Sequence, residues 1–262
     1  MNKTRKKLII GNWKMHLNTS QASMLVHRLH ERIRIHRDIE IVLAPSMLLL
    51  QPLSTQIDRR KFRLAAQNAY HKDEGAFTGE VSFTMLQDLV HYVLIGHSER
   101  RMNFGDTLEE VALKVSAAVR NGITPVLCVG ETHDERHNNE TKQVLHDQIS
   151  TALAHLTAED IEDIVIAYEP RWAIGTGVTA KPEQIDESVK FIRYQISEIY
   201  GKRAAKNVRI LYGAGVEPEY VSHILGLSCG IDGLLVGGAS LNYQKFSNII
   251  DAAYILQTQN RD

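Results

Sequence analysis

Four residues of this chain have side chains suited to acid–base chemistry on a charged substrate, and the first is Glu169. It ends the apolar run DIVIAYEP, and its neighbours Tyr168, Pro170 and Trp172 leave a carboxylate poorly solvated. Poor solvation raises the basicity of a carboxylate, so Glu169 is a candidate general base. The small residues that follow, AIGTG, are suited to a mobile cover over a site. The alternative is a solvent-facing carboxylate paired with Arg171.

His97 is the second candidate and lies in YVLIGHSERR, directly after another apolar run. Ser98 is expected to cap a short helix there, and the partial positive charge at a helix N-terminus disfavours a charged imidazole. His97 should therefore be neutral and able to donate a hydrogen bond. GHSER also begins like the nucleophile elbow G-x-S-x-G, but its fifth residue is Arg100, which makes Ser98 a poor nucleophile candidate.

Lys14 and Asn12 follow the apolar run at the start of the chain, in KLIIGNWK. A lysine held ~4 Å from an anion, at an effective dielectric constant of ~20, gains about 4 kcal/mol, which is enough to govern binding of a phosphorylated substrate. Asn12, two residues earlier on the same strand face, adds a neutral hydrogen-bond donor.

Glycines follow the last two apolar runs, at Gly213 and Gly215 and then at Gly237 and Gly238. The second pair, followed by ASL, fits the start of a helix whose backbone N–H groups point at an anion. The alternative is a pair of turn glycines.

Two other motifs resemble a nucleotide-binding loop and a metal site but are weak evidence for either. GTGVTA, over 175–180, matches the dinucleotide pattern G-x-G-x-x-A, but four residues separate it from the preceding strand, so no nucleotide cofactor is expected. His133 and His137 have helical spacing in HDERH, yet no third ligand is near in sequence. No metal is expected either.

The composition favours a small-molecule substrate. Among 262 residues, 30 Lys and Arg oppose 31 Asp and Glu, and a net charge of -1 offers no footprint for nucleic acid or an anionic membrane. Only three apolar residues follow the N-terminal basic cluster, too few for a secretion signal, and no run approaches the ~20 apolar residues of a membrane span. Cys128 and Cys229 lack disulfide or metal spacing and are expected to be unpaired, so a cytoplasmic location is expected.

Eight short apolar runs alternate with amphipathic stretches along the whole chain. Each run is nearly continuous in apolar residues, which is typical of parallel strands covered on both faces. Helices are expected over about 22–33 after a cap at Thr19 or Ser20, over 108–120 up to Asn121-Gly122, and from Pro182 to Gly201. The eight runs are KLIIGNWK, IEIVLAP, KFRLAAQN, YVLIGH, TPVLCVGE, IVIAYEP, VRILYGAG and DGLLVGG.

This alternation predicts a single (β/α)8 barrel with parallel strands over residues 1–262, with a short basic N-terminal extension at 1–6; a doubly wound open sheet is the alternative. A barrel gathers the residues that follow its strands on one rim. Glu169, His97, Lys14 and Asn12 would then meet the glycines of the last two strands.

Seven motifs in register make the chain resemble the triosephosphate isomerase family from near Ile9 to near Leu241. They are GNWKMH, AQNAY…EGAFTGEVS, YVLIGHSERR, PVLCVGE, AYEPRWAIGTG, ILYGAGV and GLLVGGASL. The resemblance implies interconversion of D-glyceraldehyde 3-phosphate and dihydroxyacetone phosphate, without a metal or organic cofactor.

The resemblance also implies a role for each candidate. Glu169 would move a proton between adjacent carbons of the triose phosphate. His97 would polarise the carbonyl and move protons between the oxygens of the enediol. Lys14 would neutralise the phosphate and the developing enediolate, with Asn12 beside it. Glu99 would not contact the substrate and would act only through these residues.

The remaining implications concern the phosphate and the assembly. Gly175, together with the backbone at Gly215, Gly237 and Gly238, would hold the phosphate. Members of the family are usually homodimers in which the third loop enters the partner subunit. That loop is HKDEGAFTGE here, with Thr78 near its tip.

The chain departs from the family pattern at three positions. Gly215 stands where a serine usually helps to latch the closed lid, so weaker lid closure and phosphate contact are expected. Arg171 replaces an apolar residue at the lid hinge. Asp106 replaces a glutamate, and this shorter acid is expected to loosen an ion pair near the subunit contact.

Two other functions stay open at this point. A related isomerase acting on a tetrulose phosphate is suggested by Gly215 alone. A sugar-phosphate-binding barrel without catalysis is the other, and the presence of all four catalytic residue types argues against it.

Overall fold

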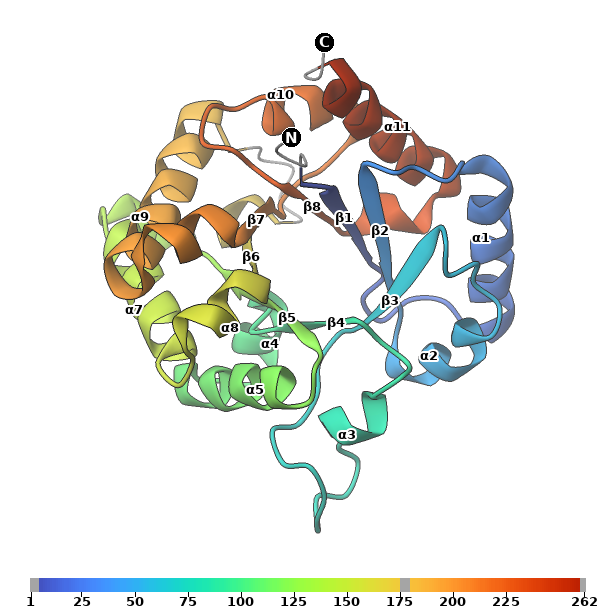
Figure 1. Ribbon diagram of the computed structural model, residues 1–262, viewed down its shortest axis with the longest axis horizontal. Coiled ribbons are helices and arrows are strands. Elements are labelled where there is room, and N and C mark those ends of the chain that lie inside the picture. The colour runs from blue at the N-terminus through green and yellow to red at the C-terminus, as the bar shows by residue number, and fades with distance from the viewer. Residues whose placement is uncertain (1–4, 175–179, 260–262) are drawn as a thin grey trace.

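Eight parallel strands form a closed barrel in the computed structural model, which describes residues 5–174 and 180–259 (Figure 1). Each strand pairs with its neighbour in sequence, and pairing of β1 with β8 closes the ring, with Leu8 opposite Gly233. The predicted (β/α)8 barrel is confirmed, and the open sheet is excluded. The strands are β1 Lys7–Asn12, β2 Ile39–Ala44, β3 Phe62–Ala66, β4 Tyr92–Ile95, β5 Thr124–Val129, β6 Val165–Tyr168, β7 Arg209–Tyr212 and β8 Gly233–Val236.

The strands are mostly apolar because both of their faces are buried, and the charged residues Glu40, Arg63 and Arg209 lie at or next to the first positions of their strands. Leu8 and Ile10 of β1 belong to a cluster inside the barrel, whereas Ile9 belongs to the larger cluster between the strands and the helices. Successive residues of a strand point to opposite faces, so a strand with a core on each side needs apolar residues at every position.

Helices surround the barrel and cover its outer face (Figure 1). They are α1 Thr19–Arg32, α2 Met47–Ser54, α3 Phe83–Leu86, α4 Ser98–Asn103, α5 Leu108–Arg120, α6 His133–His137, α7 Thr141–Leu153, α8 Ala158–Asp163, α9 Pro182–Asn207, α10 Val221–Leu225 and α11 Tyr243–Gln259, with 3-10 turns η1 Arg171–Ala173, η2 Pro218–Tyr220 and η3 Gly238–Leu241. None of the helices in the described part of the chain has the length and apolar content to span a membrane.

Two of the three predicted helix boundaries need correction. The cap of α1 is Asn18, whose side chain accepts from the Gln21 N–H while the Gln21 side chain accepts from the Asn18 N–H, so the prediction of Thr19 or Ser20 was wrong. Gly201 interrupts α9 at φ 87°, but the chain turns helical again and continues to Asn207. The predicted end of α5 at Asn121-Gly122 is confirmed, with Gly122 at φ 70°.

One loop departs from the outline of the barrel. The segment between β3 and α3, which holds HKDEGAFTGE, projects well beyond the ring of helices (Figure 1). The loop is braced internally: the Thr84 hydroxyl donates to the Asp73 carbonyl at 2.7 Å, and the Phe77 ring lies 4.7 Å from the Tyr70 ring.

Candidate active site

The four candidate catalytic side chains meet at the carboxyl ends of the strands. Asn12 ends β1 and Lys14 follows two residues later, His97 follows β4 after a single glycine, and Glu169 comes directly after β6. Three of them are almost completely buried, with exposed fractions of 5% for Asn12, 6% for His97 and 3% for Glu169. All four line a pocket of about 360 Å³. Its other lining residues include Gly213, Gly215, Gly237 and Gly238.

The geometry around His97 defines which ring nitrogen carries the proton. Its Nδ1 accepts from the Glu99 backbone N–H at 3.3 Å, so the proton of a neutral ring lies on Nε2. His97 Nε2 faces Glu169 Oε1 at 3.3 Å. His97 itself caps α4, so the prediction that Ser98 would cap this helix was wrong.

Lys14 has an unusual backbone conformation, with φ 53°. A left-handed conformation costs a residue with a side chain roughly 1–2 kcal/mol, so other groups must hold it. Asn12 Oδ1 accepts from the Lys14 N–H at 3.0 Å, and Gln67 Nε2 donates to the Lys14 carbonyl at 2.9 Å. Lys14 Nζ forms an ion pair with Glu99 Oε1 at 2.5 Å. The position of Gln67 after the third apolar run places it on the rim, but nothing in the sequence indicates that it supports Lys14.

Two glycine segments line the same pocket, and one of them, at Gly237, lies against the Lys14 side chain. Gly237 precedes the 3-10 turn η3, and a Cβ added to it would lie 3.7 Å from Lys14 Cε. Gly215 has φ 55°, and a Cβ there would approach the Ala173 carbonyl oxygen at 3.9 Å. The backbone at 215 therefore faces the base of the segment that follows Glu169. Gly175 lies outside the described residues.

Glu131 supports the site in a way that the sequence does not indicate. Its side chain is completely buried and accepts hydrogen bonds from Tyr168 Oη at 3.1 Å, Trp172 Nε1 at 3.0 Å and Arg136 at 2.9 Å. Tyr168 and Trp172 flank Glu169 in sequence, so one buried carboxylate holds the chain on both sides of the candidate base. The signal available in the sequence was a glutamate directly after the fifth apolar run.

Asp106 makes a complete ion pair despite its short side chain. Its carboxylate accepts from Arg100 at 2.9 and 3.0 Å and from Lys114 at 3.0 Å. Burial alone would raise the pKa of Asp106, but these two cations outweigh it and lower the pKa. The prediction that the shorter acid loosens this ion pair was wrong.

Arg171 lies at the start of η1, and its backbone N–H donates to the Glu131 carbonyl at 2.9 Å. Its buried Nε has no hydrogen-bond partner among residues 5–174 and 180–259. Nothing in the structure explains the arginine at this position.

Comparison with known proteins decides the family. The family model described as "Triosephosphate isomerase" matches residues 7–253. The chain belongs to the triosephosphate isomerase family. Proteins named triosephosphate isomerase from Geotalea uraniireducens and Carboxydothermus hydrogenoformans are 44% and 43% identical over 247 residues, which is 94% of this chain and 98% of each relative. One from Clostridium tetani is 42% identical over 248 residues, 94% of this chain and 96% of that protein.

Membership of the triosephosphate isomerase family confirms the predicted resemblance and the isomerase class. It does not favour the tetrulose phosphate isomerase or the barrel without catalysis. Within the described residues, no group of three or more His, Cys, Asp or Glu side chains is arranged to hold a metal ion. His133 and His137 lie on the short helix α6, which has no buried residue.

Replacing Gln67 tests the support of Lys14. In Gln67→Ala the lysine loses one of the two hydrogen bonds that hold its left-handed backbone, each worth about 1 kcal/mol. We expect KM for a triose phosphate to rise about tenfold with a smaller fall in kcat, measured in a coupled isomerase assay. Gln56→Ala, at an exposed glutamine, is the control. An unchanged KM in Gln67→Ala would remove this role.

Replacing Asp106 tests the buried ion pair. Asp106→Asn leaves the buried amine of Lys114 without its carboxylate and should lower the free energy of unfolding by about 3 kcal/mol at pH 7. Because the folded-state pKa of Asp106 is lowered, its stabilising effect is present above the unfolded pKa of about 4 and is lost as pH falls through the folded pKa. The difference from wild type should therefore shrink below about pH 4.

Urea unfolding at several pH values measures this difference. Glu187→Gln, in an exposed ion pair with Lys142, is the matched control and should change stability little at any pH. A loss in Asp106→Asn that is the same at pH 3 and pH 7 would contradict the assignment.

Proposed function

We propose that Glu169 and His97 carry the proton transfers of a triosephosphate isomerase in this chain, interconverting D-glyceraldehyde 3-phosphate and dihydroxyacetone phosphate. Glu169 takes a proton from the carbon next to the carbonyl, which leaves an enediolate, and returns it to the neighbouring carbon. His97 donates from Nε2 to the carbonyl oxygen and moves protons between the two oxygens. The observation that carries this proposal is the 3.3 Å separation of His97 Nε2 and Glu169 Oε1, with Nδ1 engaged by a backbone N–H.

The cation beside this pair supports the same reaction. Lys14 would neutralise the phosphate and the negative charge that develops on the enediolate, with Asn12 beside it. The backbone of Gly215, Gly237 and Gly238 lines the same pocket and would bind the phosphate, as would Gly175 by its place in the sequence. Glu99 would act indirectly, because its carboxylate holds the Lys14 amine.

Burial strengthens the charge interactions that the proposed reaction needs. Glu169 is only 3% exposed, so water competes little for its carboxylate, and charge interactions in such surroundings are stronger than in bulk solvent. The Lys14 side chain is 27% exposed and remains reachable from the pocket mouth.

The carboxylate of Glu169 is the first target for substitution. Glu169→Gln keeps the shape of the side chain but removes its basicity, and general base catalysis contributes about 10²- to 10⁴-fold, so kcat should fall at least ~10²-fold. The coupled isomerase assay measures this, with the exposed Glu159→Gln as control. A kcat near that of wild type would remove Glu169 from the mechanism, and no turnover by the wild-type protein would remove the proposed function.

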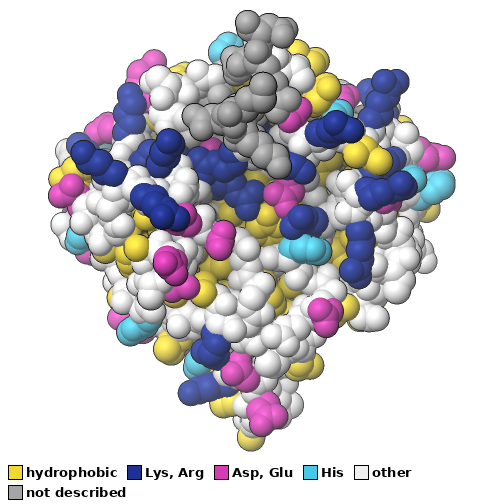
Figure 2. Space-filling model, viewed as in Figure 1, with side chains coloured by type: hydrophobic (Ala, Val, Ile, Leu, Met, Phe, Trp, Pro, Cys, Tyr) yellow, Lys and Arg dark blue, Asp and Glu magenta, His cyan; other side chains and the backbone are white. Residues whose placement is uncertain are grey.

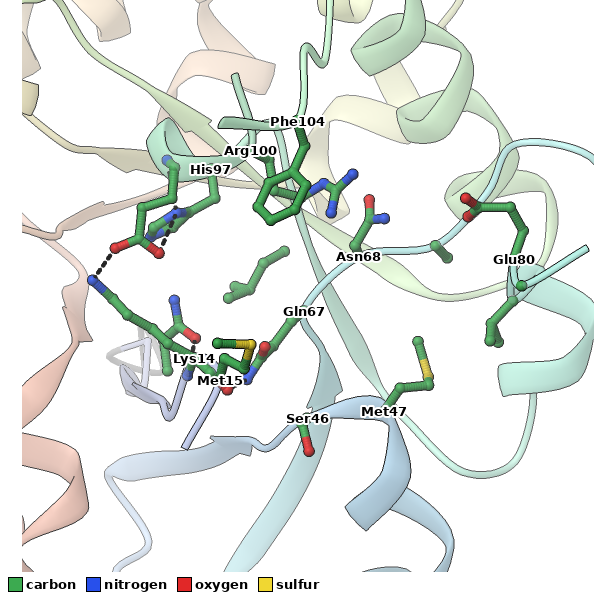
Figure 3. A pocket seen from close by; sticks show the side chains of 16 residues that line it. Lys14, Met15, Ser46, Met47, Gln67, Asn68, Glu80, His97, Arg100 and Phe104 are labelled. Atoms are coloured by element: carbon green, nitrogen blue, oxygen red, sulfur yellow. Dashed lines mark hydrogen bonds and ion pairs between the residues drawn. The ribbon is translucent and has the colours of Figure 1, made fainter. Parts of the chain in front are cut away.

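We also propose that two copies of the chain form a homodimer through the loop around Thr78. A second pocket of about 500 Å³ lies beside the catalytic one and shares Lys14 with it (Figure 3). Asn68 Oδ1 is buried there without a partner among the described residues. Exposed apolar side chains, Met15 and Phe104, stand at this pocket, with exposed fractions of 94% and 68%. A projecting loop of a second copy would cover these groups.

The two thiols support a location for the enzyme. Cys128 and Cys229 are buried and unpaired, as is usual where thiols stay reduced. We propose a cytoplasmic location on this ground.

An arginine at the tip of the loop tests the dimer. Thr78→Arg would bring a cation to a pocket that already holds Lys14 and Arg100, so we expect a shift toward monomer and at least a tenfold loss of activity. Sedimentation velocity measures the assembly, and Thr55→Arg, at an exposed residue after α2, is the control. Wild-type protein that sediments as a monomer would contradict the dimer.

A further inference from the structure

A second concave surface lies on the opposite side of the barrel from the catalytic pocket. The loops that lead into β3, β4 and β5 surround an open cavity of about 570 Å³ at the amino-terminal ends of these strands. Figure 2 shows the face that carries these strand ends, with many Lys and Arg side chains around its middle. The residues lining the cavity are Arg59, Arg63, Gln87, Asp88, Val90, His91, Tyr92, Asn121, Gly122, Ile123 and Thr124.

The cationic groups of this cavity come from two separate segments. Arg59 precedes β3, Arg63 lies within β3, and His91 directly precedes β4. The exposed guanidinium of Arg59 makes no hydrogen bond or ion pair within the described part of the chain. Like charges brought together repel one another, and Arg59 has no ion pair of its own, which makes this arrangement suited to an anion.

The nearby carboxylates do not cancel this charge. Glu40 accepts from Arg63 at 3.1 Å, from Arg209 at 2.9 Å and from the Tyr92 hydroxyl at 2.8 Å, so its charge is shared between two guanidinium groups. Asp88 also lines the cavity. Three guanidinium groups therefore face two carboxylates, before any proton is added to His91.

The walls of the cavity indicate a hydrophilic ligand. Only Val90 and Ile123 contribute aliphatic side chains to it. Gln87 and Asn121 are joined by a 3.3 Å hydrogen bond across two of the loops, and both are within reach of a ligand in the cavity. Backbone and amide groups of this kind suit hydroxyl groups or the oxygens of a compact anion.

We propose that this cavity is a binding site for a phosphate-type dianion, held by Arg59, Arg63 and His91 and independent of the catalytic pocket. Planar guanidinium groups bind such oxyanions with two hydrogen bonds each, which gives the site direction as well as charge. The ligand is either the inorganic ion or the phosphate group of a small polyhydroxylated molecule.

Anion binding at this site is coupled to protonation of His91. Burial lowers the pKa of His91, the charges of Arg63 and Arg59 lower it further, and Glu40 opposes them. A bound dianion offsets the two guanidinium charges and so raises the pKa of His91 in the complex. The complex therefore takes up a proton, and affinity rises as pH falls toward the pKa of His91.

Sulfate is the probe for the test because it remains a dianion between pH 5.5 and 8. Histidine labelled with 13C at Cε1 in the full-length protein gives one signal per histidine, and His91→Gln identifies the signal of interest. We expect this signal to shift saturably with sulfate and the affinity at pH 5.5 to be at least ~5-fold higher than at pH 8.

A matched pair of variants separates the site from general charge effects. Arg59→Gln should weaken sulfate binding about tenfold or more, whereas Arg60→Gln, next along the same loop, makes the same charge change outside the cavity and should bind as wild type. Isomerase activity should be unchanged in both.

Comparing inorganic phosphate with ribose 5-phosphate distinguishes the two sources of the anion. Tighter binding of the sugar phosphate assigns the site to a phosphorylated small molecule, and equal binding assigns it to the free ion. A His91 signal that shifts without saturation, or equally with chloride at the same ionic strength, would overturn the proposal. Equal sulfate affinities in Arg59→Gln and Arg60→Gln would also overturn it.

Discussion

Closure of the parallel sheet is the constraint on which the rest of the structure depends. When β1 pairs with β8, the sheet has no free edge, and all eight parallel strands end on the same side. Segments far apart in sequence, at residues 12–14, 97, 169 and 237, are brought to one mouth by this requirement alone. The apolar interior cannot accept charge, so polar side chains collect where the strands stop.

The mouth that holds the proposed catalytic residues combines buried charge with backbone strain. Lys14 adopts a left-handed conformation that its own residue type disfavours, and it is held there by Asn12 and Gln67. Glu131 accepts three hydrogen bonds and fixes the segment on both sides of Glu169. Asn12 and Glu131 are buried and Gln67 is half-buried, so water competes little with the hydrogen bonds that these groups make.

The two ends of the barrel use charge differently. At the carboxyl ends, carboxylates, an imidazole and an amine pair closely around a pocket. At the amino-terminal ends, Glu40 is shared by Arg63 and Arg209, while Arg59 forms no ion pair in the part of the chain that the structure describes. A chain whose total charge is close to zero therefore still has a locally positive surface, which its composition hides.

The sequence by itself indicated parallel strands alternating with helices, the family and the position of the candidate catalytic residues, whereas the structure decided between a closed barrel and an open sheet. Eight nearly continuous apolar runs are typical of parallel strands buried on both faces, and polar residues after such runs are expected at the strand ends. It did not determine which groups hold those residues. The cap at His97, the clamp of Gln67 on Lys14 and the intact ion pair of Asp106 depend on distances between segments that are remote in sequence. A local sequence pattern indicates which residues are buried and with what period. The partners of a side chain across the barrel are decided only when the strands have paired into a closed sheet.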